Sequence, residues 1–296
     1  MQAAIGLIRT MRPRQWTKNI LFVLPGIIFD QQLTNPEALF NVAIACILLI
    51  LMSGTVYIIN DIADVENDRE HPKKKFRPIA AGQLPIRLAV VTALIIPTVT
   101  LIIAFIFNIY LFGVLVAYLI LQIVYTFYLK HVPILDILVI MTGFVLRILA
   151  GVVVIDITTF SPWLYVCGGL LALLLTIGKR RQDLVTLGDE AIKTRPIYQH
   201  YNLALLDDML RLVVTSTLIT YILYTIEADT RMIANVNLAI ITVPVVLYGL
   251  FRYLYIIHVT GEGSAPDELL LKDRPLQVTI VVWALMFIIL LYILPS

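Results

Sequence analysis

The stretch NDIADVEND, residues 60–68, decides how the rest of this chain is interpreted. It follows an uncharged apolar run, residues 42–59, of the length expected inside a membrane-spanning helix. Asp61, Asp64 and Asp68 are spaced i, i+3 and i+7, which on a continuous helix keeps the three carboxylates within about 60° of one another. Hard oxygen ligands without Cys or His suit Mg²⁺ that also binds a substrate phosphate. The stretch therefore predicts a metal and diphosphate site at a membrane helix end, the alternative being an acidic helix end in solvent.

The composition places the whole chain in a membrane. Of its 296 residues 60% are hydrophobic and only 14% are charged, and the mean hydropathy is +0.91. A soluble domain cannot solvate such a surface, so we predict an all-α integral membrane protein forming one polytopic domain, residues 1–296. Nine apolar segments of spanning length are expected at about residues 20–34, 38–59, 86–107, 110–129, 133–155, 163–178, 209–227, 235–257 and 276–294.

The cationic residues fix the expected orientation. With the N-terminus inside, the loops that fall outside are about 30–37, 107–110, 156–162 and 228–234, and of the 22 Lys and Arg only Arg231 lies in them. The positive-inside rule thus predicts a cytoplasmic N-terminus and an outward-facing C-terminus. The long polar segments 60–85, 179–208 and 258–275 then face the cytoplasm, where we expect the chemistry.

Basic and aromatic residues follow the membrane helices on this face. Lys75 and Arg77 come shortly after the aspartates, Lys130 follows Tyr125 in the next cytoplasmic loop, and a cationic run opens at Lys179. Such residues could clamp phosphate groups. Each also has an ordinary explanation: topology and anionic lipid for the lysines, an interfacial aromatic belt for the tyrosine. Asp183, four residues after Lys179, could simply pair with it.

Asp136 and Arg147 lie inside one predicted span, eleven residues apart. Charges within a membrane are costly and usually meet a partner or a polar cavity. This spacing keeps both on one helix face but about 16 Å apart along the axis, too far for a direct pair. We therefore expect each to contact another helix or the polar substrate.

Other chemistries lack their motifs. The sequence contains no Walker loop, glycine-rich nucleotide fingerprint, zinc-ligand spacing or Ser-His-Asp arrangement, and no nucleic-acid partner is expected. Cys46 and Cys167 lie in apolar spans, where packing is the simplest role. A transporter remains an alternative because of the charges within the fifth predicted span.

The motifs resemble those of the UbiA-type membrane prenyltransferase superfamily. Asn60-Asp61-x-x-Asp64-x-x-x-Asp68, followed by 71–82, looks like its first aspartate-rich motif, and Arg12-Pro13-x-x-Trp16-x-Lys18-Asn19 resembles its N-terminal signature. The second aspartate-rich motif of that superfamily is replaced here by residues 178–183, which are cationic. This departure, with 130–136, 143–151 and 273–276, resembles the branch that transfers phosphoribosyl groups to decaprenyl phosphate.

The resemblance implies a nine-helix UbiA-type bundle and a Mg²⁺-dependent transfer from phosphoribosyl pyrophosphate to a polyprenyl phosphate. The implied metal ligands and catalytic residues are Asp61, Asp64 and Asp68. The implied substrate-binding residues are Asn60, Arg14, Lys18, Lys75, Arg77, Tyr125, Lys130, Asp136, Arg147, Lys179, Arg180 and Asp183. The alternative within the superfamily is an aromatic or other prenyltransferase that uses a prenyl diphosphate. A bacterial or archaeal plasma membrane is the expected location, and the oligomeric state, a homo-oligomer included, stays open.

Overall fold

The computed structural model describes residues 2–70, 74–157, 161–188, 190–228, 230–233, 236–260 and 272–294. Helices make up almost all of them. The chain divides into two compact units, one formed by Met1–Phe127 with Leu146–Thr158 and the other by Tyr128–Val145 with Thr159–Ser296. The expectation of one domain over residues 1–296 stays a prediction.

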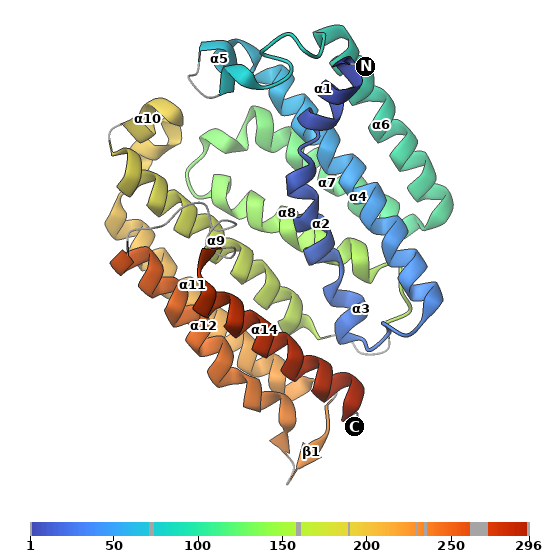
Figure 1. Ribbon diagram of the computed structural model, residues 1–296, viewed down its shortest axis with the longest axis vertical. Coiled ribbons are helices and arrows are strands. Elements are labelled where there is room, and N and C mark those ends of the chain that lie inside the picture. The colour runs from blue at the N-terminus through green and yellow to red at the C-terminus, as the bar shows by residue number, and fades with distance from the viewer. Residues whose placement is uncertain are drawn as a thin grey trace. The chain divides into compact units, whose positions relative to one another are not determined.

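Unit 1 contains the helices before residue 128 and the second part of α8 (Figure 1). Its elements are α1 (Gln2–Thr10), η1 (Pro13–Gln15), α2 (Trp16–Val23), α3 (Pro25–Phe29), α4 (Pro36–Ala63), α5 (Val65–Glu70), η2 (Lys74–Phe76), α6 (Ile86–Phe107), α7 (Ile109–Phe127) and residues 146–152 of α8 (Leu135–Val152).

Helix α4 is the centre of unit 1. It begins where Asn35 caps the first turn, its side-chain oxygen accepting from the backbone N–H of Glu37 at 3.0 Å, and Pro36 fits the first helical position. Leu49 and Met52 of α4 are fully buried in a core that also contains residues of α7. The helix packs along α6, which lies beside it in Figure 1. This packing carries α4 as one rod to the start of the aspartate-rich stretch.

Unit 2 contains the elements after residue 127 apart from the end of α8. They are η3 (Leu129–His131), the first part of α8, α9 (Pro162–Leu187), α10 (Glu190–Thr194), η4 (Pro196–His200), α11 (Leu203–Glu227), β1 (Met232–Ile233), β2 (Val236–Asn237), η5 (Leu238–Thr242), α12 (Val243–Tyr255), the π-helix η6 (Ile256–Thr260), α14 (Arg274–Ile288) and the π-helix η7 (Ile289–Ile293). The strands β1 and β2 form a short antiparallel hairpin.

Helices α9 and α11 form the main packing pair of unit 2, and α12 packs against α14 (Figure 1). Buried apolar side chains of α9, α11 and α12 fill one core, which also encloses Ile197 and Tyr201 around η4. The polar segment that follows α9 is therefore anchored on the helices by its own buried residues. This anchoring positions the cationic end of α9.

Within the described residues, eight helical segments are long and apolar enough to cross a membrane. They are Pro36–Ala63, Ile86–Phe107, Ile109–Phe127, Leu135–Val152, Pro162–Leu187, Leu203–Glu227, Leu238–Thr260 and Arg274–Ile293. Each corresponds to one of the nine expected spans, which confirms a helical multi-pass membrane protein. The remaining expected span, about 20–34, falls on α2 and α3, two short helices that meet at Leu24, just before Pro25, which lacks the N–H that a continuous helix would use.

Candidate active site

The aspartate-rich stretch does not form one continuous helix. Helix α4 ends at Ala63, Asp64 has φ −98° and ψ 8°, and α5 begins at Val65. The continuous helix expected here is therefore interrupted at the middle aspartate. Asp61 and Asp68, on opposite sides of the turn, are both 2% exposed, whereas Asp64 is half-buried.

Two arginines contact the outer aspartates, and one of them contacts both. Arg77 Nη1 lies 2.6 Å from Asp68 Oδ2 and 3.2 Å from Asp61 Oδ1. Arg12 Nη2 lies 2.9 Å from the same Asp61 oxygen. Because one guanidinium nitrogen touches both carboxylates, Asp61 and Asp68 face a common point, as the sequence hypothesis of a convergent site requires.

The remaining candidates of this stretch have separate surroundings. The Asn60 side-chain oxygen accepts a hydrogen bond from the Thr126 hydroxyl, which ties the end of α4 to α7 beside the half-buried Tyr125. Lys75 is exposed, with Nζ 5.4 Å from the centroid of its neighbour's ring, Phe76. Residues 71–73 of the predicted motif lie outside the described residues.

Arg147 meets neutral polar partners inside unit 1. Its Nε donates to Asn19 Oδ1 of α2 and its Nη2 donates to the Tyr118 hydroxyl of α7, both at 2.8 Å. Asn19 in turn donates to Ser53 Oγ of α4, also at 2.8 Å. The expectation that this charge contacts other helices is confirmed. Arg14 is exposed on η1 and Lys18 is half-buried on α2.

Asp136 contacts Arg180 and Tyr201 within unit 2, and its expected contact with the substrate stays a prediction. It is completely buried at the start of α8, where Oδ1 accepts a hydrogen bond of 2.5 Å from the Tyr201 hydroxyl. Arg180 Nη2 of α9 lies 2.9 Å from Oδ2, an ion-pair contact without hydrogen-bond alignment, and Arg180 itself is 4% exposed. Tyr201 also accepts from the backbone N–H of Ile134 at 2.7 Å. Asp136, like Arg147, thus contacts another helix, as expected. It links α8 to α9 and to the end of η4.

The rest of the α9 motif continues this network. Tyr198 of η4 donates a hydrogen bond of 2.5 Å to Asp183 Oδ2, and its ring lies 5.4 Å from the Arg180 guanidinium carbon. Burial raises the pKa of Tyr198 to about 12, so its hydroxyl remains a donor at neutral pH. Lys179 is exposed on α9 and Lys130 is half-buried on η3. Of the α9 candidates, Lys179 therefore presents its charge outward, while Arg180 is directed inward.

The comparison with known proteins agrees with the motif analysis. A sequence profile described as the UbiA prenyltransferase family matches residues 19–260.

The chain belongs to the UbiA prenyltransferase family.

Three bacterial relatives in this family are similar over nearly the whole chain, and each is named decaprenyl-phosphate phosphoribosyltransferase. The Corynebacterium glutamicum protein is 32% identical over 296 residues, covering 99% of this chain and 88% of that protein. The Mycolicibacterium smegmatis protein is 32% identical over 291 residues (94% and 90%), and the Mycobacterium tuberculosis protein is 31% identical over 285 residues (94% and 91%).

Solved structures support the UbiA fold. A UbiA homolog from Archaeoglobus fulgidus bound to DMAPP and Mg²⁺ has a TM-score of 0.72 at 19% identity, covering 95% of this chain and 96% of that one. A structure of digeranylgeranylglyceryl phosphate synthase has a TM-score of 0.68 at 18% identity, covering 98% and 95%. At these identities the likeness concerns the fold alone.

The sequence predicts a Mg²⁺ ion, which the carboxylates of this UbiA family member would have to coordinate. Among the described residues, no three Asp, Glu, His or Cys side chains gather closely enough to hold a metal ion together. Asp61 and Asp68 nevertheless converge, and Mg²⁺ is commonly bound through one or two carboxylates with waters and substrate phosphates. The donor set fits a metal shared with phosphate groups and does not fit a cage of protein ligands alone. A ligand role for Asp64 stays a prediction.

The sequence reasoning missed several residues of these networks. Arg12 and Asn19 belong to the N-terminal motif, which by itself predicts no contact for either residue. Tyr118, Tyr198 and Tyr201 carried no signal, because a tyrosine in or beside an apolar helix is ordinary. Their roles arise from tertiary contacts, which spacing along one helix does not encode.

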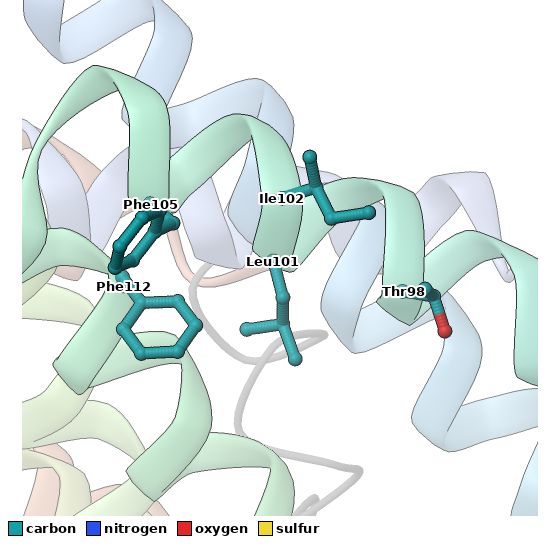
Figure 2. Close-up of a pocket in the computed structure, with 5 residues that line it drawn as sticks. All are labelled: Thr98, Leu101, Ile102, Phe105 and Phe112. Atoms are coloured by element: carbon teal, nitrogen blue, oxygen red, sulfur yellow. The ribbon is translucent and has the colours of Figure 1, made fainter.

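An apolar pocket on the surface of unit 1 lies away from these charges. It has a volume of about 320 Å³ and is lined by Thr98, Leu101, Ile102, Phe105 and Phe112 of α6 and α7 (Figure 2). The two phenylalanine rings meet edge to face with centroids 5.4 Å apart. With one hydroxyl and no charge, this pocket suits a hydrocarbon chain and not a phosphate group.

Proposed function

We propose that this chain transfers the 5-phosphoribosyl group of phosphoribosyl pyrophosphate to a polyprenyl phosphate, with decaprenyl phosphate as the acceptor, and releases pyrophosphate. One observation carries the proposal: bacterial relatives named for this activity are 31–32% identical over 94–99% of the chain. The cationic run that opens at Lys179 supports it, because a donor and acceptor with several phosphates need more cations than a prenyl diphosphate and a weakly charged acceptor. The product would be a precursor of arabinose donors for the cell envelope.

The topology that we propose has nine membrane-spanning helices, a cytoplasmic N-terminus and a site that faces the cytoplasm of a bacterial or archaeal cell. The eight long apolar helices support most of this count. Helices α2 and α3 would supply the ninth span as an interrupted pair. The nearly exclusive placement of Lys and Arg in one set of loops supports the orientation.

Asp61 and Asp68 would hold Mg²⁺ against the pyrophosphate of the donor, with Asp64 and Asn60 in support. The metal would stabilise the negative charge that develops on the leaving pyrophosphate. The protein would contribute positioning and charge: Arg77 at the diphosphate, with Lys75, Lys130 and Lys179 as further candidates for the phosphates of the donor. Arg180, which is buried against Asp136, would act by fixing the end of α9 that carries Lys179. Candidates for the lipid phosphate are Arg14, Lys18 and Arg147.

The acceptor chemistry needs little acid–base help. A lipid phosphate is already anionic at neutral pH, so no strong general base is required for its attack on C1 of the ribose. The oxygen would attack opposite to the departing pyrophosphate, which predicts inversion at C1. The second candidate function is transfer from a prenyl diphosphate, favoured by the match of residues 19–260 to the UbiA prenyltransferase family. A transporter is less compatible with the transferase relatives.

The proposal is tested with the purified full-length protein in detergent, Mg²⁺, radiolabelled phosphoribosyl pyrophosphate and decaprenyl phosphate. We expect label in the organic phase only when the metal and the lipid are both present, and none from an Asp61→Asn variant that is equally well folded. Consumption of a prenyl diphosphate in place of phosphoribosyl pyrophosphate would overturn the assignment in favour of the second function.

A further inference from the structure

Four charged side chains of unit 1 form a closed network with an inner and an outer layer. The inner layer is the carboxylate pair Asp61 and Asp68, each 2% exposed. The outer layer is Arg12 and Arg77, whose side chains are 34% and 27% exposed. A ligand that approaches the carboxylates from solvent therefore meets the arginines first.

The charges of this network cancel. Two carboxylates face two guanidinium groups, and Asp61 Oδ1 is contacted by both arginines. A divalent cation is drawn to paired carboxylates by their two negative charges, and here those charges are already compensated at distances of 2.6–3.2 Å. The network as it stands should bind a bare divalent cation weakly.

The arginines are held in place by more than the carboxylates. Arg12 has φ +52°, a left-handed conformation that is uncommon for a residue with a side chain, and its guanidinium carbon lies 4.5 Å from the centroid of the Tyr57 ring. Arg77 begins a hydrogen-bonded turn, with its carbonyl accepting from the Ala81 N–H at 2.8 Å. Arg12 thus has a ring contact and Arg77 a backbone turn besides the carboxylates, and part of each side chain is open to solvent.

We propose that Arg12 and Arg77 are exchangeable counter-ions of the metal-binding carboxylates, which makes binding of the divalent cation depend on an arriving diphosphate. The two guanidinium groups neutralise Asp61 and Asp68 until a diphosphate supplies other oxygen acceptors. They then turn to the phosphate oxygens, for which arginine is well suited, and leave the carboxylates to the divalent cation. This deepens the proposed function, on which it rests for the pyrophosphorylated donor. It assigns Arg12 to a site for which the sequence analysis does not predict a role.

The experiment measures Mn²⁺ bound to the purified full-length protein by electron paramagnetic resonance, with and without inorganic pyrophosphate. For the wild type we expect weak binding of Mn²⁺ alone and at least tenfold tighter retention with pyrophosphate present. For Arg77→Gln we expect Mn²⁺ alone to bind at least tenfold more tightly than to the wild type, with little further gain from pyrophosphate. Arg12→Gln should change binding in the same direction, and it gives the answer if Arg77→Gln does not fold.

The matched control is Arg69→Gln. Arg69 lies on α5 close to Asp68 in sequence, but its guanidinium pairs with the exposed Glu66 at 3.0 Å. The same loss of charge there should leave Mn²⁺ affinity within twofold of the wild type, and Asp61→Asn should abolish the site. Unchanged or weaker Mn²⁺ binding to folded Arg77→Gln would overturn the proposal and make the arginines permanent supports of the carboxylates. Because no ribosyl donor or lipid is used, this result does not depend on whether phosphoribosyl transfer is confirmed.

Discussion

Replacing Asp136 by alanine tests whether this residue is a structural anchor or a ligand of the substrate. The substitution leaves the Arg180 guanidinium, 4% exposed, without the carboxylate 2.9 Å away. Removing one partner of a buried ion pair costs about 3–5 kcal/mol, because the other charge stays buried. With roughly 2–4 °C of melting temperature per kcal/mol for a protein of about this size, the melting temperature should fall by roughly 6–20 °C. The change in melting temperature is measured by thermal unfolding in detergent, with intrinsic fluorescence as the readout.

Two further variants make this prediction specific. Tyr201→Phe removes the hydroxyl that donates to Asp136 and accepts from the Ile134 N–H, but it leaves the ion pair with Arg180 intact, so its cost should be smaller. The double variant should lose less than the sum, because both changes break the same hydrogen bond between Tyr201 and Asp136. The matched control is Asp208→Ala, which breaks an ion pair with Arg211 at 3.0 Å whose partners are 71% and 76% exposed. That control should have little effect.

A melting temperature of Asp136→Ala within about 2 °C of the wild type would refute the reasoning from buried charge. If the variant instead kept its stability and raised only the KM for the donor, Asp136 would meet the substrate, as the sequence alone suggested. The two outcomes separate a residue that fixes α8 against α9 from one that binds phosphoribosyl pyrophosphate.

Three other predictions concern single positions. Gly151→Ala should destabilise the protein by about 1–3 kcal/mol, because a Cβ there would meet the backbone of α2, whereas Gly113→Ala, where a Cβ meets nothing within 4 Å, should be neutral or stabilising; equal melting temperatures would contradict this. The Arg252 guanidinium lowers the pKa of Asp273, so its stabilisation is fully present above about pH 4 and is lost as pH falls through the lowered pKa. The gap in melting temperature between the wild type and Asp273→Asn should therefore be constant from pH 7 to 5 and close in acid, and a gap that persists at pH 2 would exclude the ion pair as its cause. Lys179→Ala should raise the KM for phosphoribosyl pyrophosphate more than that for the lipid, and equal effects would place Lys179 elsewhere.

The membrane helices could be predicted because a span of about 20 apolar residues is a local property of the sequence. The sequence predicts that Arg147 has polar partners, since a charge inside a span needs them. It does not predict which residues these are, because Asn19 is 128 residues away along the chain. The turn at Asp64 was missed because three aspartates at helical spacing also suit a continuous helix. The contact of Arg77 with both outer carboxylates is also not encoded in this spacing, because it depends on how the following loop folds back.

The structure distinguishes the two cations at the end of α9, Lys179 and Arg180, which the sequence alone does not. From the sequence, Lys179 and Arg180 are equivalent candidate phosphate ligands, but a helix places adjacent residues about 100° apart, so the two side chains face different surroundings. Arg180 forms an ion pair with the buried Asp136 and lies over the ring of Tyr198, while Lys179 is exposed. An aspartate in place of Arg180 would set two carboxylates against each other in a buried site. In this basic motif we therefore expect the inward Arg180 to serve folding and the outward Lys179 to serve donor binding. Changing Arg180 should lower stability, whereas changing Lys179 should lower the affinity for the donor.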